Sequence, residues 1–68
     1  MKKRETVSNH VAVFREKRAA TQQKLADAVG VTRQTIIAIE RGNYTPSVLL
    51  AMKIARYFKV PLEDVFSL

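Results

Sequence analysis

The stretch from Thr21 to Ser47, TQQKLADAVGVTRQTIIAIERGNYTPS, constrains the fold of this chain more than any other part of it. Thr21 and Thr32 can each cap a helix, because a threonine hydroxyl can accept a hydrogen bond from a free backbone N–H one turn further on. Gly30 follows the last apolar position of the first helix, where a glycine can turn left-handed without a Cβ clash. Gly42 closes the second helix in the same manner. The stretch therefore predicts two short helices joined by a tight turn.

Apolar residues recur along these two helices at helical spacing. Leu25, Ala26 and Val29 form one stripe, and Ile36 and Ile39 form the next. Two helices that cross steeply over a short turn must approach closely, and Ala26 supplies the small side chain that the crossing needs. Together with the turn glycine and the branched anchor Ile36, this spacing indicates a helix-turn-helix. In that motif one helix lies in the DNA major groove and the other braces it.

The composition agrees with a DNA-binding domain and excludes several other classes. The 68 residues include 12 Lys and Arg against 6 Asp and Glu, and the net charge is +6. Such an excess suits a polyanion, although solvated basic side chains also serve solubility. The absence of cysteine removes disulfides and thiolate metal sites. Without a long apolar run or a signal peptide, we expect a cytoplasmic protein with no cofactor and no metal.

Signals outside the motif predict three further helices around it. Residues 1–8 form a basic arm, and a first helix covers 9 to about 18. A loop at 43–46 leads to a fourth helix that Ser47 caps, and Pro61 opens a last turn that runs through Phe66. The expected fold is an all-α bundle of five helices, with a domain over 9–66 and a tail at 67–68. The buried face of the fourth helix is expected to comprise Val48, Ala51, Ile54, Ala55 and Phe58.

The chain resembles the Cro/XRE family of helix-turn-helix regulators, which includes the lambda-type repressors. The resemblance covers roughly residues 9 to 66. It is carried by Asn9–Val11, Phe14-Arg15, Thr21-Gln22, Leu25-Ala26, Gly30-Val31, Ile36, Ile39-Glu40, Gly42, Pro46-Ser47, Ile54-Ala55, Phe58 and Leu62–Phe66. It implies a compact lambda-repressor-like bundle in which Val7 can add a short extended pairing with the chain's end. It also implies a regulator, here a repressor, that binds a double-stranded DNA operator.

The resemblance places the start of the third helix, residues 33–41, at the base edges. It implies base contacts from Arg33, Gln34 and Ala38, with Thr35 and Ile37 flanking them. The chemistry agrees, because Arg33 can donate two hydrogen bonds to guanine and Gln34 can pair with adenine. The competing interpretation is that Arg33 and Gln34 are ordinary first-turn surface residues. Ile37 lies off the apolar stripe, so it either contacts a thymine methyl group, as Ala38 can, or fills the edge of the core.

The resemblance also implies contacts with the DNA backbone. The backbone N–H of Gln22 would point at a phosphate, helped by the N-terminus of its helix. Arg41, Asn43 and Tyr44 follow the recognition helix and are expected along the backbone too. For Lys24 and Arg18, DNA contact and a solvated surface position are equally supported.

A structural ion pair is a further implication of the resemblance. Relatives pair an arginine in the first helix with a glutamate late in the third, partly buried between the helices. The matching residues are Arg15 and Glu40. Their expected role is to fix the recognition helix, because losing one partner strands a charge.

Small regulators of this kind bind as homodimers to palindromic operators, with half-sites about 34–36 Å apart. The expected interface lies near the C-terminal end of the chain. Its candidates are Leu49, Tyr57, Phe66 and Leu68. Leu62 and Val65 are expected to complete the core of the monomer instead.

Three other hypotheses are weaker. An enzyme is disfavoured because His10 stands alone, without a serine, cysteine or carboxylate placed to work with it. An antitoxin of a toxin–antitoxin pair, which would also regulate its own gene, shares the expected fold, but such proteins carry an extra segment that occupies the toxin. A DNA-binding piece of a longer regulator is disfavoured by the Met1 start and the apolar finish.

Overall fold

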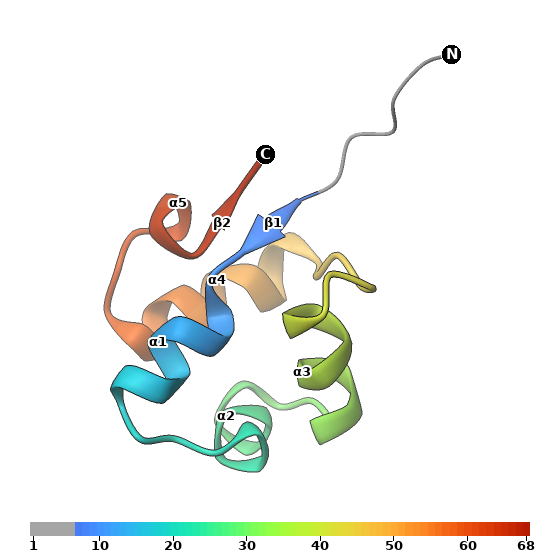
Figure 1. Cartoon of the computed structure of the whole chain (residues 1–68), viewed down its shortest axis with the longest axis vertical. Coiled ribbons are helices and arrows are strands. Elements are labelled where there is room, and N and C mark those ends of the chain that lie inside the picture. The colour runs from blue at the N-terminus through green and yellow to red at the C-terminus, as the bar shows by residue number, and fades with distance from the viewer. Residues whose placement is uncertain (1–6) are drawn as a thin grey trace.

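The computed structural model describes residues 7–68. Its five helices confirm the all-α bundle that the sequence predicts, and they surround one core (Figure 1). Two short strands lie side by side at one end. In chain order the elements are β1 (Ser8–Asn9), α1 (Val11–Lys17), α2 (Gln22–Val29), α3 (Arg33–Glu40), α4 (Val48–Phe58), α5 (Leu62–Val65) and β2 (Phe66–Ser67).

Three helices begin at the hydroxyl caps that the sequence predicts. The Thr21 Oγ1 accepts a hydrogen bond from the Lys24 N–H at 3.0 Å, and the Ser47 Oγ accepts one from the Leu50 N–H at 3.1 Å. Thr32 caps α3 in the same way. These bonds satisfy N–H groups that have no partner inside the helix, and each such cap contributes about 1 kcal/mol.

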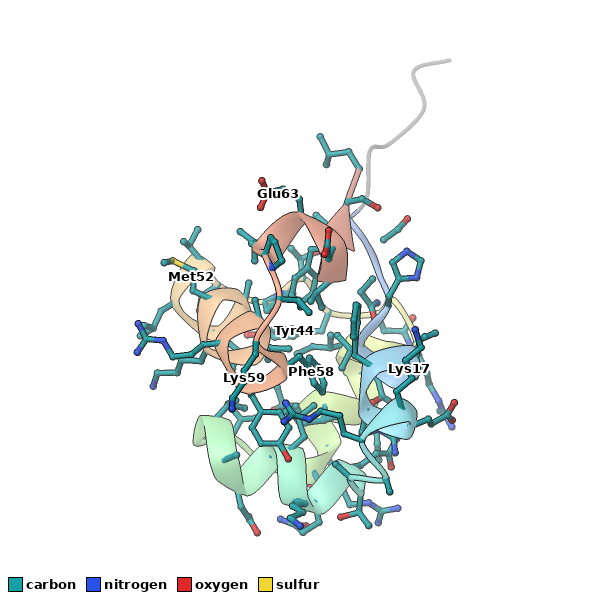
Figure 2. The ribbon with its side chains drawn as sticks, turned by 90° about the vertical axis from the view of Figure 1, so that its left-hand side faces the viewer. Lys17, Tyr44, Met52, Phe58, Lys59 and Glu63 are labelled. Atoms are coloured by element: carbon teal, nitrogen blue, oxygen red, sulfur yellow. The ribbon has the colours of Figure 1, made fainter. Side chains whose placement is uncertain are left out.

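The core lies where the helices meet. Its largest fully buried side chains are Leu25, Ile36, Ile39, Ile54, Val11 and Val65. Phe14 of α1 stacks on Phe58 of α4, with ring centroids 5.6 Å apart, and Figure 2 shows Phe58 in the middle of the bundle. Burying a side chain of this size contributes roughly 1.5–3 kcal/mol, so Ile36 and Ile39 hold α3 against the rest of the domain.

The expected buried face of α4 was wrong at one position. Val48 is 74% exposed, whereas Leu50 is only 8% exposed. Both positions fit the helical period, since Val48 lies three residues before Ala51 and Leu50 lies four before Ile54. Val48 is the first residue of α4, so its side chain lies at the end of the helix, where it is left exposed. Leu50 takes its place in the core.

The ends of the chain also differ from the prediction in detail. Helix α1 begins at Val11 and not at Asn9, because Asn9 pairs with Phe66 in an antiparallel ladder in which Ser8 also pairs with Ser67. The paired residues are therefore Ser8 and Asn9 instead of Val7. The last helix ends at Val65, and Phe66 is extended in β2. A hydrogen bond of 2.8 Å from the His10 N–H to the Val65 carbonyl continues this pairing.

Candidate nucleic-acid interface

Helices α2 and α3 form the helix-turn-helix through a turn centred on Gly30. Gly30 is left-handed, with φ +79°, and its N–H donates to the Ala26 carbonyl at 2.9 Å. The N–H of Val31 donates to the same carbonyl at 3.0 Å. The Ala26 side chain is fully buried. The small residue at the crossing and the left-handed glycine thus set the angle at which α3 leaves α2.

The first turn of α3 presents its polar side chains to solvent. Arg33 and Gln34 are exposed, while Ile36, in the same stretch of the helix, is fully buried. The residues one turn further on, Ile37 and Ala38, are half-buried. Because positions four apart share a helix face, Arg33 aligns with Ile37 and Gln34 with Ala38. The predicted base-contacting residues therefore lie together on the surface of α3.

Thr35 differs from its neighbours. It is half-buried, and its hydroxyl oxygen lies 3.2 Å from that of Thr32. Its backbone N–H donates to the same Thr32 oxygen at 3.3 Å. Thr35 is therefore part of the cap of α3 in the free protein.

The start of α2 and the start of α3 line one open hollow. Its walls are formed by Arg15, Thr21, Gln22, Gln23 and Arg33. The N-terminus of α2 carries partial positive charge from its unpaired N–H groups, and Arg33 adds a full charge beside it. This arrangement can attract a phosphate oxygen, which agrees with the predicted backbone contact at Gln22.

Arg15 of α1 and Glu40 of α3 lie in contact. The Arg15 Nε donates to Glu40 Oε2 at 2.7 Å and its Nη2 to Glu40 Oε1 at 3.3 Å, while Nη1 donates to the Ala20 carbonyl at 3.0 Å. The side chains are only 15% and 9% exposed. The hydrogen bond with Glu40 raises the pKa of Arg15 above its ordinary value. A raised arginine pKa means that this stabilisation is lost only at strongly alkaline pH.

Two further hydrogen bonds at the same end of α3 were not predicted. The Gln22 Nε2 donates to Glu40 Oε1 at 3.1 Å, so this side chain joins the ion pair. The Asn9 Nδ2 donates to the Ile39 carbonyl at 2.8 Å. Both bonds join residues far apart in sequence, and neither produces a periodic pattern. The only available signal was that both residues belong to the set that carries the family resemblance.

The remaining predicted backbone contacts follow α3 directly. Arg41, Asn43 and Tyr44 are exposed. The Asn43 N–H donates to the Ala38 carbonyl at 2.9 Å, which folds this loop back onto the helix. Lys24 is also exposed on α2.

Arg18, by contrast, is engaged within the domain. It donates to the Tyr57 carbonyl and lies over the Tyr57 ring, 5.5 Å from its centroid. This contact joins the end of α1 to α4 and uses the guanidinium for the fold.

The residues predicted for the dimer interface differ in how far their side chains are exposed. Leu49 and Leu68 are 65% and 90% exposed. Tyr57 and Phe66 are half-buried and pack against the core of their own domain. Val65 is fully buried as expected, but Leu62 is exposed, so the prediction that it completes the core was wrong. Leu62 opens the short helix α5, which leaves its side chain at the edge of the bundle.

One histidine lies in the part of the chain that the structure describes. His10 is exposed at the start of α1. Within residues 7–68, no three His, Cys, Asp or Glu side chains gather in a way that could hold a metal ion. No helix in this range has the length and apolar character to cross a membrane.

Sequence comparisons place the chain among regulators. The helix-turn-helix family matches residues 12–65. The chain is 50% identical over 60 residues to the uncharacterized HTH-type transcriptional regulator YgzD of Bacillus subtilis, covering 88% of this chain and 91% of the relative. The same values hold for an uncharacterized HTH-type transcriptional regulator of Methanocaldococcus jannaschii. A phage repressor, RstR of Vibrio cholerae, is 28% identical over 88% of this chain and 54% of its own length.

Solved structures share the fold at lower identity. A putative DNA-binding protein from Bacteroides fragilis superposes with a TM-score of 0.82 at 21% identity, covering 91% of this chain and 100% of that one. The restriction-modification controller protein C.AhdI from Aeromonas hydrophila superposes with a TM-score of 0.74 at 22% identity, over 79% and 82% of the two chains. The chain described here is a member of the Cro/XRE-type helix-turn-helix family of DNA-binding transcriptional regulators.

Proposed function

We propose that this protein is a sequence-specific repressor that binds double-stranded DNA with α3 in the major groove. The observation that carries the proposal is the division of α3 into two faces. Ile36 and Ile39 anchor one face in the core, which leaves Arg33 and Gln34 exposed on the first turn of the other. These two side chains have the donors and acceptors that distinguish guanine and adenine in the major groove.

Contacts with the DNA backbone complete the proposed interface. The N-terminus of α2 at Gln22 and the exposed residues Arg41, Asn43 and Tyr44 lie before and after α3 in the chain. In this arrangement the phosphate contacts fix the register of the protein, and the base contacts select the sequence. Repression is supported by the similarity to RstR, which is a phage transcriptional repressor.

The protein is further proposed to bind as a homodimer through the exposed surface of α4. Val48, Leu49 and Met52 are each more than half exposed on this helix, and Figure 2 shows Met52 pointing away from the bundle. Apolar side chains gathered in this way mark interaction surfaces. Tyr57 and Phe66 contribute less than the sequence predicts, because their own domain already covers part of each.

The charged residues of α4 and α5 favour a second copy of this chain as the partner of the apolar surface. Lys53 and Arg56 of α4 line a hollow together with Leu49 and Met52. The exposed residues of α5 carry the opposite charge at Glu63 and Asp64. In a twofold dimer the basic edge of each copy can face the acidic α5 of the other.

Selection of bound sequences from random DNA tests the proposed function. The expected result is a palindromic site whose half-sites are about one helical turn apart. Enrichment of no sequence over random DNA would reject sequence-specific binding.

Two arginine variants then separate base contacts from phosphate contacts. Arg33→Ala should cost roughly 1–3 kcal/mol on the selected site and relax the preference at one base pair. Arg41→Ala should weaken binding on every sequence and reduce the salt dependence by about one charge. If Arg33→Ala weakened all sequences equally, Arg33 would be a phosphate contact.

Sedimentation at micromolar concentration tests the dimer. Leu49→Glu should produce a monomer and abolish cooperative occupancy of the two half-sites. Val13→Glu is the matched control, because Val13 is also apolar and 47% exposed but lies on α1. A wild-type protein that sedimented as a monomer, with and without DNA, would reject the proposed interface.

A further inference from the structure

We propose that Asn9 is a positioning residue for base recognition. Its side chain ties the last turn of α3 to the paired strands β1 and β2, and this tie sets where Arg33 and Gln34 meet the bases. The inference rests on the proposed DNA-binding function. It gives the paired strands β1 and β2 a role in the selection of the DNA sequence.

The amide of Asn9 is engaged at both of its polar atoms. Its Nδ2 donates to the Ile39 carbonyl of α3 at 2.8 Å, and its Oδ1 accepts from the Val11 N–H at 3.1 Å. The residue is half-buried, so water competes less for these bonds than at an exposed site. One side chain therefore joins the start of α1 to the end of α3.

The Ile39 carbonyl is a suitable point at which to hold the helix. It lies in the last turn, where carbonyls have no partner further along the helix. It also accepts from the Gly42 N–H at 2.9 Å, so the helix end and the following turn share this acceptor with Asn9. The Ile39 side chain is 1% exposed and anchors the same residue in the core.

Asn9 is itself held in place from the other direction. Its backbone pairs with Phe66 in the antiparallel ladder, and the His10 N–H donates to the Val65 carbonyl at 2.8 Å. Val65 is fully buried. The tie therefore begins at a fixed point, and Figure 1 shows both strands at the end of the molecule where α4 begins and α3 ends.

The geometry of α3 converts a small movement at Ile39 into a larger one at the bases. Arg33 lies six residues earlier, about 9 Å along the helix axis at the usual rise per residue. A tilt of roughly 6° about the held end would displace the first turn by about 1 Å. Hydrogen bonds tolerate only a few tenths of an ångström around their preferred length. A tilt of α3 about Ile39 therefore disturbs base contacts more than it disturbs phosphate contacts, which are made by long, flexible side chains.

The test compares the selected operator with non-specific DNA. Asn9→Ala should weaken binding to the operator by roughly fivefold to tenfold, in line with the loss of one hydrogen bond, and should leave non-specific affinity within twofold. Asn9→Asp keeps the acceptor for Val11 but places an oxygen against the Ile39 carbonyl. Its ratio of specific to non-specific affinity should fall at least as far. Ser8→Ala, on the same strand and exposed, is the matched control and should leave the ratio unchanged.

A second measurement separates positioning from loss of folding. In the free, folded protein, the amide resonances of Arg33 and Gln34 should shift in Asn9→Ala and Asn9→Asp but not in Ser8→Ala. An unchanged affinity ratio in both Asn9 variants, measured where they are folded, would overturn the inference. Failure of the wild-type protein to prefer any sequence would instead reject the proposed function.

Discussion

The two ends of helix α3 are held very differently. At its start, the Thr32 cap makes a hydrogen bond of 3.3 Å and the next two side chains, Arg33 and Gln34, are exposed. At its end, the Glu40 carboxylate accepts from Arg15 and Gln22, and the preceding carbonyl accepts from Asn9. One end is therefore anchored by side chains from α1, α2 and β1, while the other is anchored mainly by its own cap.

Electrostatics explain why the end of α3 needs these partners. A glutamate in the last turn of a helix is unfavourable, because the unpaired carbonyls there carry partial negative charge. Arg15 compensates with two hydrogen bonds to Glu40. At the start of the helix, Arg33 is placed unfavourably against the positive end of the same dipole. That charge is exposed to solvent and free to meet an anion, whereas the charge at the other end is neutralised inside the domain.

Breaking the anchored end should have the largest effect. Glu40→Ala should lower the free energy of unfolding by about 3 kcal/mol, because it leaves the Arg15 guanidinium without its carboxylate. In a domain of this size, the loss lowers the melting temperature by on the order of 15 °C. Urea and thermal unfolding measure both quantities.

The matched control is a double-mutant cycle with Arg15→Ala. The double variant should be more stable than the sum of the two single losses predicts, because neither charge is then stranded. Strict additivity would show that the pair contributes nothing beyond its separate side chains.

Weakening the free end should have a smaller effect. Thr32→Ala removes the cap of α3 and should cost about 1 kcal/mol of stability. Thr45→Ala, in the exposed loop before α4, is a threonine-to-alanine control that should stay close to wild type. Equal losses in the two variants would mean that the cap does not stabilise α3.

Changing an exposed residue of the first turn should have the smallest effect on stability. Gln34→Ala should stay within about 0.5 kcal/mol of wild type in unfolding experiments. The same variant should lose roughly 1–3 kcal/mol of discrimination at one A·T pair of the selected operator. If stability fell by as much as in Thr32→Ala, Gln34 would belong to the scaffold.

Local signals accounted for most of the fold. Thr21, Thr32 and Ser47 cap their helices because a hydroxyl and the N–H groups of the next turn are close in sequence. Gly30 ends α2 because its position requires a positive φ. The core stripe of α4 was predicted except at Val48, where the helical period fits Leu50 equally well and only the packing of the bundle decides between them.

The long-range hydrogen bonds could not be predicted in the same way. The bond from Asn9 to Ile39 joins a side chain to a backbone carbonyl 30 residues away. Every residue has a backbone carbonyl, so the sequence does not show which one accepts this bond. Gln22 was expected to use its backbone on a phosphate, and its side chain proves to bind Glu40 as well. The base and phosphate contacts themselves remain predictions, because they depend on DNA that lies outside the chain.

The pairing of β1 with β2 has a consequence for the order in which the domain can form. Helices α2 and α3 pack through contacts close in sequence, whereas Ser8 meets Ser67 across almost the whole described chain. Closing so long a loop costs more entropy than forming a local contact, so we expect this pairing to form after the local contacts. Helices α2 and α3 can therefore pack against each other first, and Asn9 gains its fixed position only when β1 pairs with β2. On the proposal that Asn9 positions α3, the protein acquires its full sequence discrimination as one of the last events of its folding.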